Sequence, residues 1–168
     1  LIYRKIESQK LRSQLGVDSF TIGFIGRFVK EKGIIDLLKA VSRINNNFSL
    51  LLVGSGKLRY EIEEEGRRLG ILEKIRIVDA IPSSMVPHYL NCMDCLVLPS
   101  RTTRKWKEQF GRVLTEAMSC EVPVIGSDSG EIPNVLGDCG LIFKEGSVEG
   151  LSSKIMLLIN DINLRMEL

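Results

Sequence analysis

The sequence predicts an α/β protein with a doubly wound parallel sheet of about six strands. Two observations support this prediction. Six short apolar segments recur along the 168 residues, and most are continuously apolar, as is typical of strands covered on both faces. Segments with helical spacing of apolar residues separate them, and alternating strands and helices produce a parallel sheet flanked by helices.

The elements follow from local patterns in chain order. Leu1, Ile2, Ile6 and Leu11 predict a first helix that Gly16 ends. The predicted strands are residues 20–26, 48–54, 74–80, 94–100, 122–127 and 140–143. Apolar residues at helical spacing predict helices around 34–41, 58–69, 86–90 and 113–118, a short helix after the polar turn at 127–130, and a last helix at about 147–160, opened by Ser147.

The chain length fits one domain, residues 1–168. Because the chain starts with a helix and without Met, we expect a piece of a longer protein. The net charge of +2, from 23 basic and 21 acidic residues, does not favour nucleic acid as a partner. No apolar run approaches the roughly 18 residues of a membrane span, and the first residues are too charged for a signal peptide, so we expect a cytoplasmic protein.

Four cysteines raise the question of a metal or redox site, because Cys92 and Cys95 form a C-x-x-C pair. That pair ends a predicted helix and enters a strand, which is the reverse of a thioredoxin-type motif. Cys120 and Cys139 lie too far apart to complete a zinc site. We therefore predict no metal site and reduced, largely buried thiols. His88, the only histidine, is interpreted as structural.

Doubly wound sheets bind ligands beyond the carboxyl ends of their strands, so the residues after each strand are the candidates. Gly26 and Arg27 follow the first strand, and Lys32 precedes the next helix. The two cations can hold a diphosphate, or they can be solvated surface charges.

The segment "VGSGKLRY" (53–60) resembles a phosphate loop but fails the pattern, because Leu51 and Leu58 occupy positions of the motif's Gly and Ser or Thr. Arg59 excludes the dinucleotide fingerprint in the same way. What remains is a glycine turn at Gly54, which either lets the backbone approach a ligand or is only a tight turn.

The segment "EQFGRVLTEAM" (108–118) is the most informative. The amides of Gly111, Arg112 and Val113 open a predicted helix and can bind phosphate oxygens. Glu108, in the preceding loop, can accept hydrogen bonds from polyol hydroxyls, and Glu116 can accept a vicinal hydroxyl pair such as that of a ribose. A capping carboxylate and a solvated helix glutamate are the alternative.

Two further segments are left open. Ser127 and Ser129 with Gly130 either bind a ligand or cap and turn the chain. The loop at 101–107, "RTTRKWK", contains the only Trp and either contacts an acidic acceptor or a partner, or is a solvated basic loop.

Taken together, four segments resemble the C-terminal, donor-binding domain of family-4 (group 1) retaining glycosyltransferases of the GT-B fold. These are "GRFVKEKG", "LLLVGSGKLR", "MVPHYLNCMDCLVLPS" and "EQFGRVLTEAMSCEVPVIGSDSGEIPNVLGDCG". The resemblance covers about residues 20–160, and its most specific element is the E-x7-E pair, Glu108 and Glu116, with Phe110 and Gly111 between them. Two positions depart from the family pattern, since Ala80 and Glu121 stand where the family usually has Gly.

The resemblance implies a Rossmann-like domain that binds a nucleotide diphosphate sugar without a metal ion or other cofactor. Arg27 and Lys32 would neutralise the leaving diphosphate, and Glu108 would hold sugar hydroxyls, helped by the amides of Phe110 and Gly111. Glu116 would hold the ribose, and the backbone near Ile81 would border the base. On family frequency the expected nucleotide is UDP, ahead of GDP and ADP.

Transfer would retain the anomeric configuration, by front-face attack of the acceptor with the leaving phosphate taking its proton. The acceptor, a glycan or a lipid, would be bound by an N-terminal domain that this piece lacks, and any peripheral membrane contact would come through that domain. Alone, the piece is expected to bind donor weakly and to transfer nothing. The alternatives are a GT-B-like nucleotide-sugar epimerase or phosphorylase, and a non-catalytic nucleotide-binding module.

Overall fold

The computed structural model describes residues 8–168 and contains one six-stranded parallel sheet in the order β3-β2-β1-β4-β5-β6. The strands are β1 (Phe20–Ile25), β2 (Phe48–Val53), β3 (Ile75–Val78), β4 (Cys95–Leu98), β5 (Val124–Ser127) and β6 (Leu141–Phe143). Each lies within a segment that the sequence predicts as a strand. The predicted fold class is confirmed.

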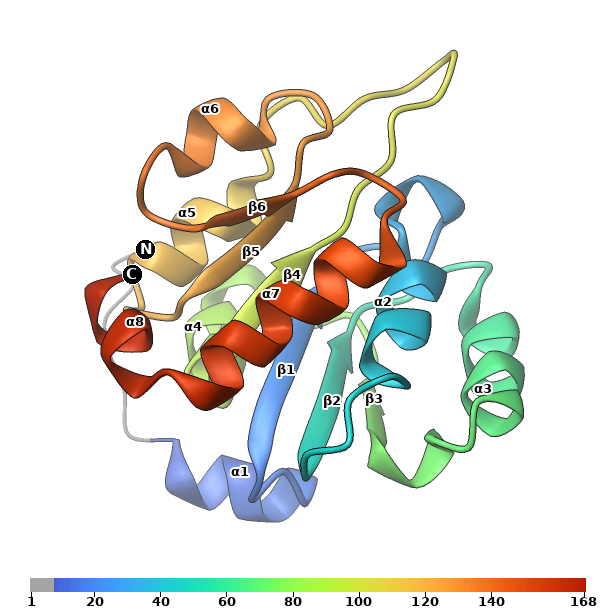
Figure 1. Cartoon of the computed structure of the whole chain (residues 1–168). Coiled ribbons are helices and arrows are strands. Elements are labelled where there is room, and N and C mark those ends of the chain that lie inside the picture. The colour runs from blue at the N-terminus through green and yellow to red at the C-terminus, as the bar shows by residue number, and fades with distance from the viewer. Residues whose placement is uncertain (1–7) are drawn as a thin grey trace.

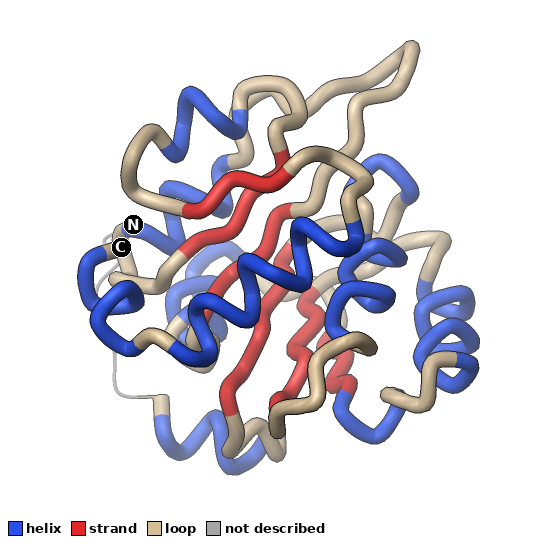
Figure 2. The backbone as a smooth tube through the Cα atoms, in the orientation of Figure 1, coloured by secondary structure: helices blue, strands red, loops and turns tan. Residues whose placement is uncertain are grey.

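Helices cover both faces of this sheet. On one face lie α2 (Ile34–Val41), α3 (Arg59–Arg68) and α7 (Val148–Asn160), with α7 crossing in front of the strands in Figures 1 and 2. On the other face lie α4 (Val86–Leu90), α5 (Arg112–Met118) and α6 (Ile132–Leu136). The remaining helices are α1 (Gln9–Leu15) and α8 (Ile162–Glu167), and short 3-10 turns span Lys30–Lys32, Leu72–Lys74 and Ser83–Met85.

The sheet divides the apolar core into two clusters. Strand β2 shows why, because successive side chains of a strand point to opposite faces. Leu50 and Leu52 pack with α2 and α7, whereas Leu51 and Val53 pack with α4 and α5. All six residues of β2 are buried, which explains why this strand is apolar without alternation.

The chain reverses its winding direction at the centre of the sheet. Strand β1 pairs with β2 on one side and with β4 on the other, so the loops that leave β1 and β4 diverge to opposite faces. These loops also touch each other. Gly33 has φ +66°, and a Cβ there would lie 1.9 Å from the carbonyl oxygen of Pro99. The loops after β1 and β4 therefore meet at the carboxyl edge of the sheet, where a ligand is expected.

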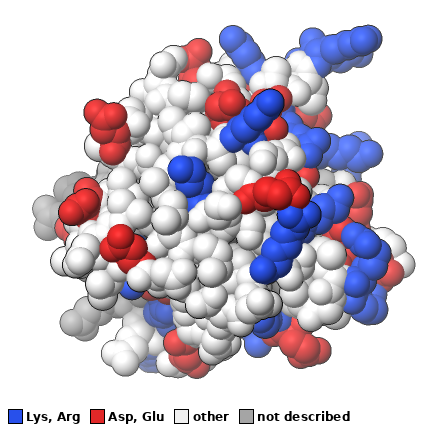
Figure 3. Space-filling view, in the orientation of Figure 1, with Lys and Arg blue, Asp and Glu red and all other residues white. Residues whose placement is uncertain are grey.

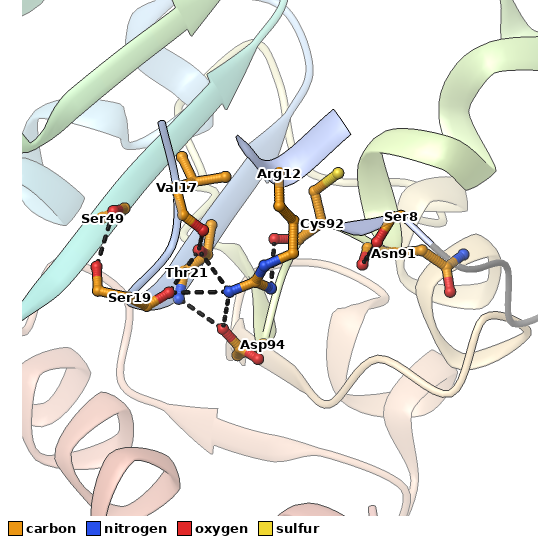
Figure 4. Close-up of polar contacts among 9 residues, drawn as sticks. All are labelled: Ser8, Arg12, Val17, Ser19, Thr21, Ser49, Asn91, Cys92 and Asp94. Carbon is orange, nitrogen blue, oxygen red and sulfur yellow. Dashed lines mark hydrogen bonds and ion pairs between the residues drawn. The ribbon is translucent and has the colours of Figure 1, made fainter. Parts of the chain in front are cut away.

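A polar network secures the opposite edge of the sheet, and Figure 4 shows its residues. Arg12 on α1 donates to the Cys92 carbonyl at 3.0 Å, to the Ser19 carbonyl at 2.9 Å and to Asp94 Oδ2 at 3.1 Å. Asp94 Oδ2 also accepts from the Thr21 amide at 2.7 Å. One guanidinium therefore joins α1 to the starts of β1 and β4, far along the strands from the carboxyl edge.

Three details bear on the sequence-based expectations. The first helix is described from Gln9 and ends at Gly16 with φ +64°, while the part predicted over residues 1–7 lies outside the described residues. Helix α8 was not predicted, although Asp161 caps it by accepting from the Leu164 amide at 3.0 Å. Glu121 has φ +57°, which accounts physically for a preference for Gly at this position.

Candidate donor-binding site

A cleft of about 610 Å³ opens at the carboxyl edge of the sheet, where the winding reverses. Residues from the loops after β1, β3 and β4 and from the start of α5 form its walls. Nine of the eleven predicted site residues line it, namely Gly26, Lys32, Ile81, Glu108, Phe110, Gly111, Arg112, Val113 and Glu116. The structure thus brings together segments that lie up to 90 positions apart in the sequence, from Gly26 to Glu116.

The other two predicted residues, Arg27 and Gly54, line a smaller adjoining hollow of about 210 Å³. It shares Ile25, Gly26, Ile81 and Val86 with the main cleft. Arg27 is exposed, and within the described part of the chain no hydrogen bond or ion pair of its guanidinium is found. Its charge is therefore available at the side of the cleft.

Gly54 serves the packing of two loops. A Cβ on Gly54 would lie 1.9 Å from the Gly26 carbonyl oxygen, and one on Gly56 would lie 2.4 Å from the Phe28 carbonyl oxygen. The Phe28 amide donates to the Ser55 carbonyl at 2.8 Å. The missing side chains thus let the loops after β1 and β2 touch, and this supports the tight-turn alternative for "VGSG".

Glu108 is the most constrained polar residue of the cleft, and its side chain is 10% exposed. Its Oε2 accepts from Lys32 Nζ at 2.5 Å and from Ser100 Oγ at 2.8 Å. Because both donors reach Oε2, Oε1 has no hydrogen-bond partner among the described residues. The carboxylate is therefore held in one orientation, and Oε1 retains its capacity to accept a hydrogen bond.

The backbone of Glu108 is fixed by the loop after β5. Its carbonyl accepts from the Glu131 amide at 2.9 Å, and a Cβ on Gly130 would lie 2.0 Å from the same oxygen. Ser127 Oγ donates to the Ser100 carbonyl at 2.6 Å, and Ser129 Oγ lies 2.9 Å from Thr102 Oγ1. Both serines are buried, so they position the Glu108 loop, and the interpretation of this turn as a capping and turning segment is supported.

Glu116 enters the cleft from α5. The helix begins at Arg112 after Gly111, whose φ of +70° lets the chain turn sharply from the loop into the helix. Arg112 Nε lies 3.4 Å from Glu116 Oε1, and the Glu116 side chain is 13% exposed. At the mouth of the cleft, Phe110 leaves 52% of its surface exposed. Both glutamates of the E-x7-E pair therefore line one cavity, each beside a cation.

Sequence reasoning missed several lining residues. Ser83 follows Ile81 in the segment after β3, Val86 begins α4, and Gln109 follows Glu108. Extending each predicted segment by a few residues would have found them. Ser100, which supports Glu108, is predicted only as the end of the strand at 94–100, because a sequence does not show which carboxylate a hydroxyl will reach.

The cysteines lie away from this cleft. Cys92, Cys95 and Cys120 are buried, and Cys139 is exposed. Burial raises the pKa of Cys92, Cys95 and Cys120 above the ordinary thiol value, although hydrogen bonds from Ser8 to Cys92 and from Asn91 to Cys120 partly oppose it. Among residues 8–168, no group of three or more His, Cys, Asp or Glu side chains is placed to hold a metal ion. No helix in this part of the chain combines the length and apolarity of a membrane span.

A parallel sheet with a polar cleft at its winding reversal defines the class of Rossmann-like, ligand-binding α/β domains. Comparison with known proteins places the chain more narrowly. The family model for glycosyl transferases group 1 matches residues 5–168, and the chain belongs to this family. The capsular polysaccharide biosynthesis glycosyltransferase CapM of Staphylococcus aureus is 35% identical over 153 residues, covering 88% of this chain and 39% of CapM.

Solved structures agree with this assignment. HepE of Anabaena in complex with UDP superposes with a TM-score of 0.89 at 25% identity, covering 99% of this chain and 48% of HepE. The C-terminal domain of LpcC, a glycosyl transferase group 1 family protein from Francisella tularensis, superposes with a TM-score of 0.85 at 23% identity, covering 99% and 89%. The fold is that of a GT-B C-terminal domain, and the chain spans less than half the length of the curated relatives named first in the comparison.

Proposed function

We propose that this chain binds the nucleotide diphosphate sugar donor of a retaining, metal-independent glycosyltransferase that modifies a glycan or lipid acceptor. The observation that carries the proposal is the single cleft that gathers Lys32, Glu108 and Glu116 at the carboxyl edge of the sheet. HepE, which has the same fold at 25% identity, has been solved with UDP and with UDP-glucose. We therefore propose UDP as the nucleotide, ahead of GDP and ADP.

In this proposal the two glutamates bind different parts of the donor. Glu108 accepts a hydrogen bond from a hydroxyl of the transferred sugar through Oε1, because Oε2 is already occupied by Lys32 and Ser100. Glu116 accepts the ribose hydroxyls, and the backbone at Ile81 borders the base. The amides of Phe110 and Gly111 add donors on the sugar side.

Lys32 and Arg27 supply the positive charge that the leaving diphosphate needs. An ammonium has three N–H donors, so Lys32 can keep one on Glu108 and offer another to a phosphate oxygen. Arg27 reaches the same region from the adjoining hollow. During transfer, the acceptor hydroxyl oxygen bonds to the anomeric carbon as the bond from that carbon to the diphosphate oxygen breaks. The nucleoside diphosphate leaves with the electron pair and takes the hydroxyl proton.

The proposal is tested by calorimetric titration with UDP, GDP and ADP in buffer containing a metal chelator. We expect one of the three to bind with clear preference, and Arg27→Ala and Glu116→Ala each to weaken that binding by about tenfold, equivalent to about 1.4 kcal/mol. The matched control is Arg43→Ala, which removes an exposed guanidinium that pairs with Glu149 of α7 and lines neither the cleft nor the adjoining hollow. It should leave the affinity unchanged. Equal weakening by the control, or no binding of any nucleotide, would contradict the proposal.

A further inference from the structure

The loop at 101–107 projects from the body of the domain, as Figure 1 shows in yellow between β4 and α5. Figure 3 shows Lys and Arg side chains gathered at this end of the molecule. The proposed donor site uses none of these charges, and the loop contains the only Trp of the chain.

The root of this loop is held firmly. Arg101 donates from both Nε and Nη2 to the carboxylate of Asp36, at 2.7 Å for the Nη2 bond. The Thr102 amide donates to Glu145 Oε2 at 3.0 Å. A Thr103 amide bond to the Trp106 carbonyl at 2.7 Å closes the turn at the tip. Contacts to two other parts of the fold, α2 and the segment after β6, therefore hold the root of the loop, and the bond between Thr103 and Trp106 closes its tip.

The tip has the opposite character. Arg104, Lys105 and Lys107 are exposed, and no hydrogen bond or ion pair of their side chains is found in the described part of the chain. In this, Arg104 differs from most surface arginines elsewhere in that part, which are paired with a carboxylate, as are Arg43, Arg59, Arg67 and Arg68. Three unpaired cations on an anchored turn constitute a local site for a negative charge.

This tip borders an open hollow next to the proposed donor site. The hollow has a volume of about 300 Å³ and is lined by residues 102–107 and by Gln109. Gln109 also lines the main cleft, so the two cavities share a wall. Trp106 lines the hollow, and its ring centroid lies 5.2 Å from Nζ of Lys32, which lines the main cleft. A molecule in the hollow would therefore lie next to the main cleft.

We propose that this hollow, which we call the loop subsite, binds the negatively charged group of an anionic acceptor, a sugar that carries a phosphate or carboxylate. The inference rests on the proposed function, because an acceptor hydroxyl must reach the anomeric carbon next to Glu108. Cations at the tip match the anionic group, and the Trp106 ring offers an apolar surface for the sugar. The donor diphosphate is not the ligand of this subsite, because Lys32 and Arg27 are already available to it.

Trp106, as the only Trp, provides a local reporter of binding. The probe is glucose 6-phosphate, titrated against the chain saturated with UDP so that the donor site is filled, with glucose as the neutral control. We expect the phosphorylated sugar to change Trp106 fluorescence saturably, and glucose to have no effect. The variant Arg104→Gln/Lys105→Gln/Lys107→Gln should weaken this binding at least tenfold, and added salt should weaken it in the wild-type chain.

The matched control is Lys10→Gln/Arg67→Gln/Arg68→Gln, which removes the same number of exposed cations from α1 and α3. It should leave the affinity for glucose 6-phosphate unchanged. Equal responses to glucose and glucose 6-phosphate, or equal weakening by the two triple variants, would overturn the proposal.

A separate measurement uses vesicles of phosphatidylglycerol and of phosphatidylcholine. The acceptor assignment would be overturned in favour of a membrane contact by three results together. The wild-type chain would bind only the anionic vesicles, the loop variant would lose this binding, and the wild-type chain would not respond to glucose 6-phosphate. Calorimetric UDP binding by the wild-type chain separates the two proposals. If the wild-type chain binds UDP but does not respond to glucose 6-phosphate, the loop subsite alone is refuted. If the wild-type chain does not bind UDP, the donor site is refuted.

Discussion

The ion pair between Lys32 and Glu108 contributes to folding stability and, in the proposed function, to nucleotide binding. Substitutions at the two residues distinguish these contributions. Lys32→Met keeps the length of the side chain but removes the ammonium that lies 2.5 Å from Glu108 Oε2. The carboxylate then remains in a nearly buried position with Ser100 as its only hydrogen-bond donor among the described residues. We expect the variant to lose both folding stability and nucleotide affinity.

The burial of the pair sets the size of the stability effect. Fully exposed ion pairs contribute about 0.2–1 kcal/mol, and removing one partner of a fully buried pair costs about 3–5 kcal/mol. The Lys32 and Glu108 side chains are 15% and 10% exposed. Because the cleft still admits water and Ser100 still donates, we expect Lys32→Met to lower the free energy of unfolding by about 2 kcal/mol.

The double variant Lys32→Met/Glu108→Gln has no uncompensated charge, so it should recover about 1.5 kcal/mol of this loss. Nucleotide binding should behave differently. UDP affinity should fall about tenfold in both variants that lack the ammonium, and Glu108→Gln alone should leave it unchanged, because Glu108 is assigned to the sugar.

Urea unfolding at pH 7 and calorimetric titration with UDP measure the two effects on the same samples. Arg67→Met is the control, since its pair with Glu64 is 60% and 49% exposed and should contribute less than about 1 kcal/mol. The reasoning is refuted if Lys32→Met unfolds like the wild-type chain, or if the double variant is as unstable as Lys32→Met.

Three further predictions follow from other parts of the molecule. Gly130→Ala should lower the free energy of unfolding by more than about 3 kcal/mol and weaken UDP-glucose binding, because the strain of a left-handed backbone adds to a clash with the Glu108 carbonyl. The control is Gly70→Ala, where φ is +69° and a Cβ would meet no atom within 4 Å. It should cost only about 1–2 kcal/mol in urea unfolding. Arg12→Ala should lower stability by about 2–3 kcal/mol and leave UDP affinity unchanged, since its network lies at the opposite edge of the sheet; weaker UDP binding would contradict this. Brief iodoacetamide treatment at pH 8, followed by mass spectrometry, should find only Cys139 labelled among the cysteines. Cys92, Cys95 and Cys120 are buried, and their raised pKa values lower the thiolate fraction. Rapid labelling of these three would contradict their burial.

The order and type of the sheet-forming elements could be predicted because each depends on a local pattern. Six apolar runs gave six strands, and the continuous burial of β2 matches its unbroken apolar sequence. Helix α8 escaped prediction because its apolar residues, Ile162, Leu164 and Met166, alternate along the chain and do not follow helical spacing, and only its cap at Asp161 marked it.

The candidate site could be predicted in part, through the rule that ligands bind at the carboxyl edge of such a sheet. That rule selected Gly26, Lys32 and the segment 108–116, and the structure places them around one cleft. The rule does not distinguish a glycine needed for a ligand from one needed for packing. Gly54 is needed for packing, because its missing side chain accommodates the backbone of Gly26, and it also lines the hollow beside the cleft.

The sequence by itself determined the strands, the helices around them and the residues at the strand ends, because hydrophobic period and turn chemistry are local properties. Only the tertiary structure decided that Lys32 and Ser100 share one oxygen of Glu108, and that Gly130 packs on the same loop. Such pairings depend on loop backbones brought together by the winding of the sheet, and hydrogen bonds act over about 3 Å. No spacing along the chain encodes a distance of that size between residues 76 positions apart, as Lys32 and Glu108 are.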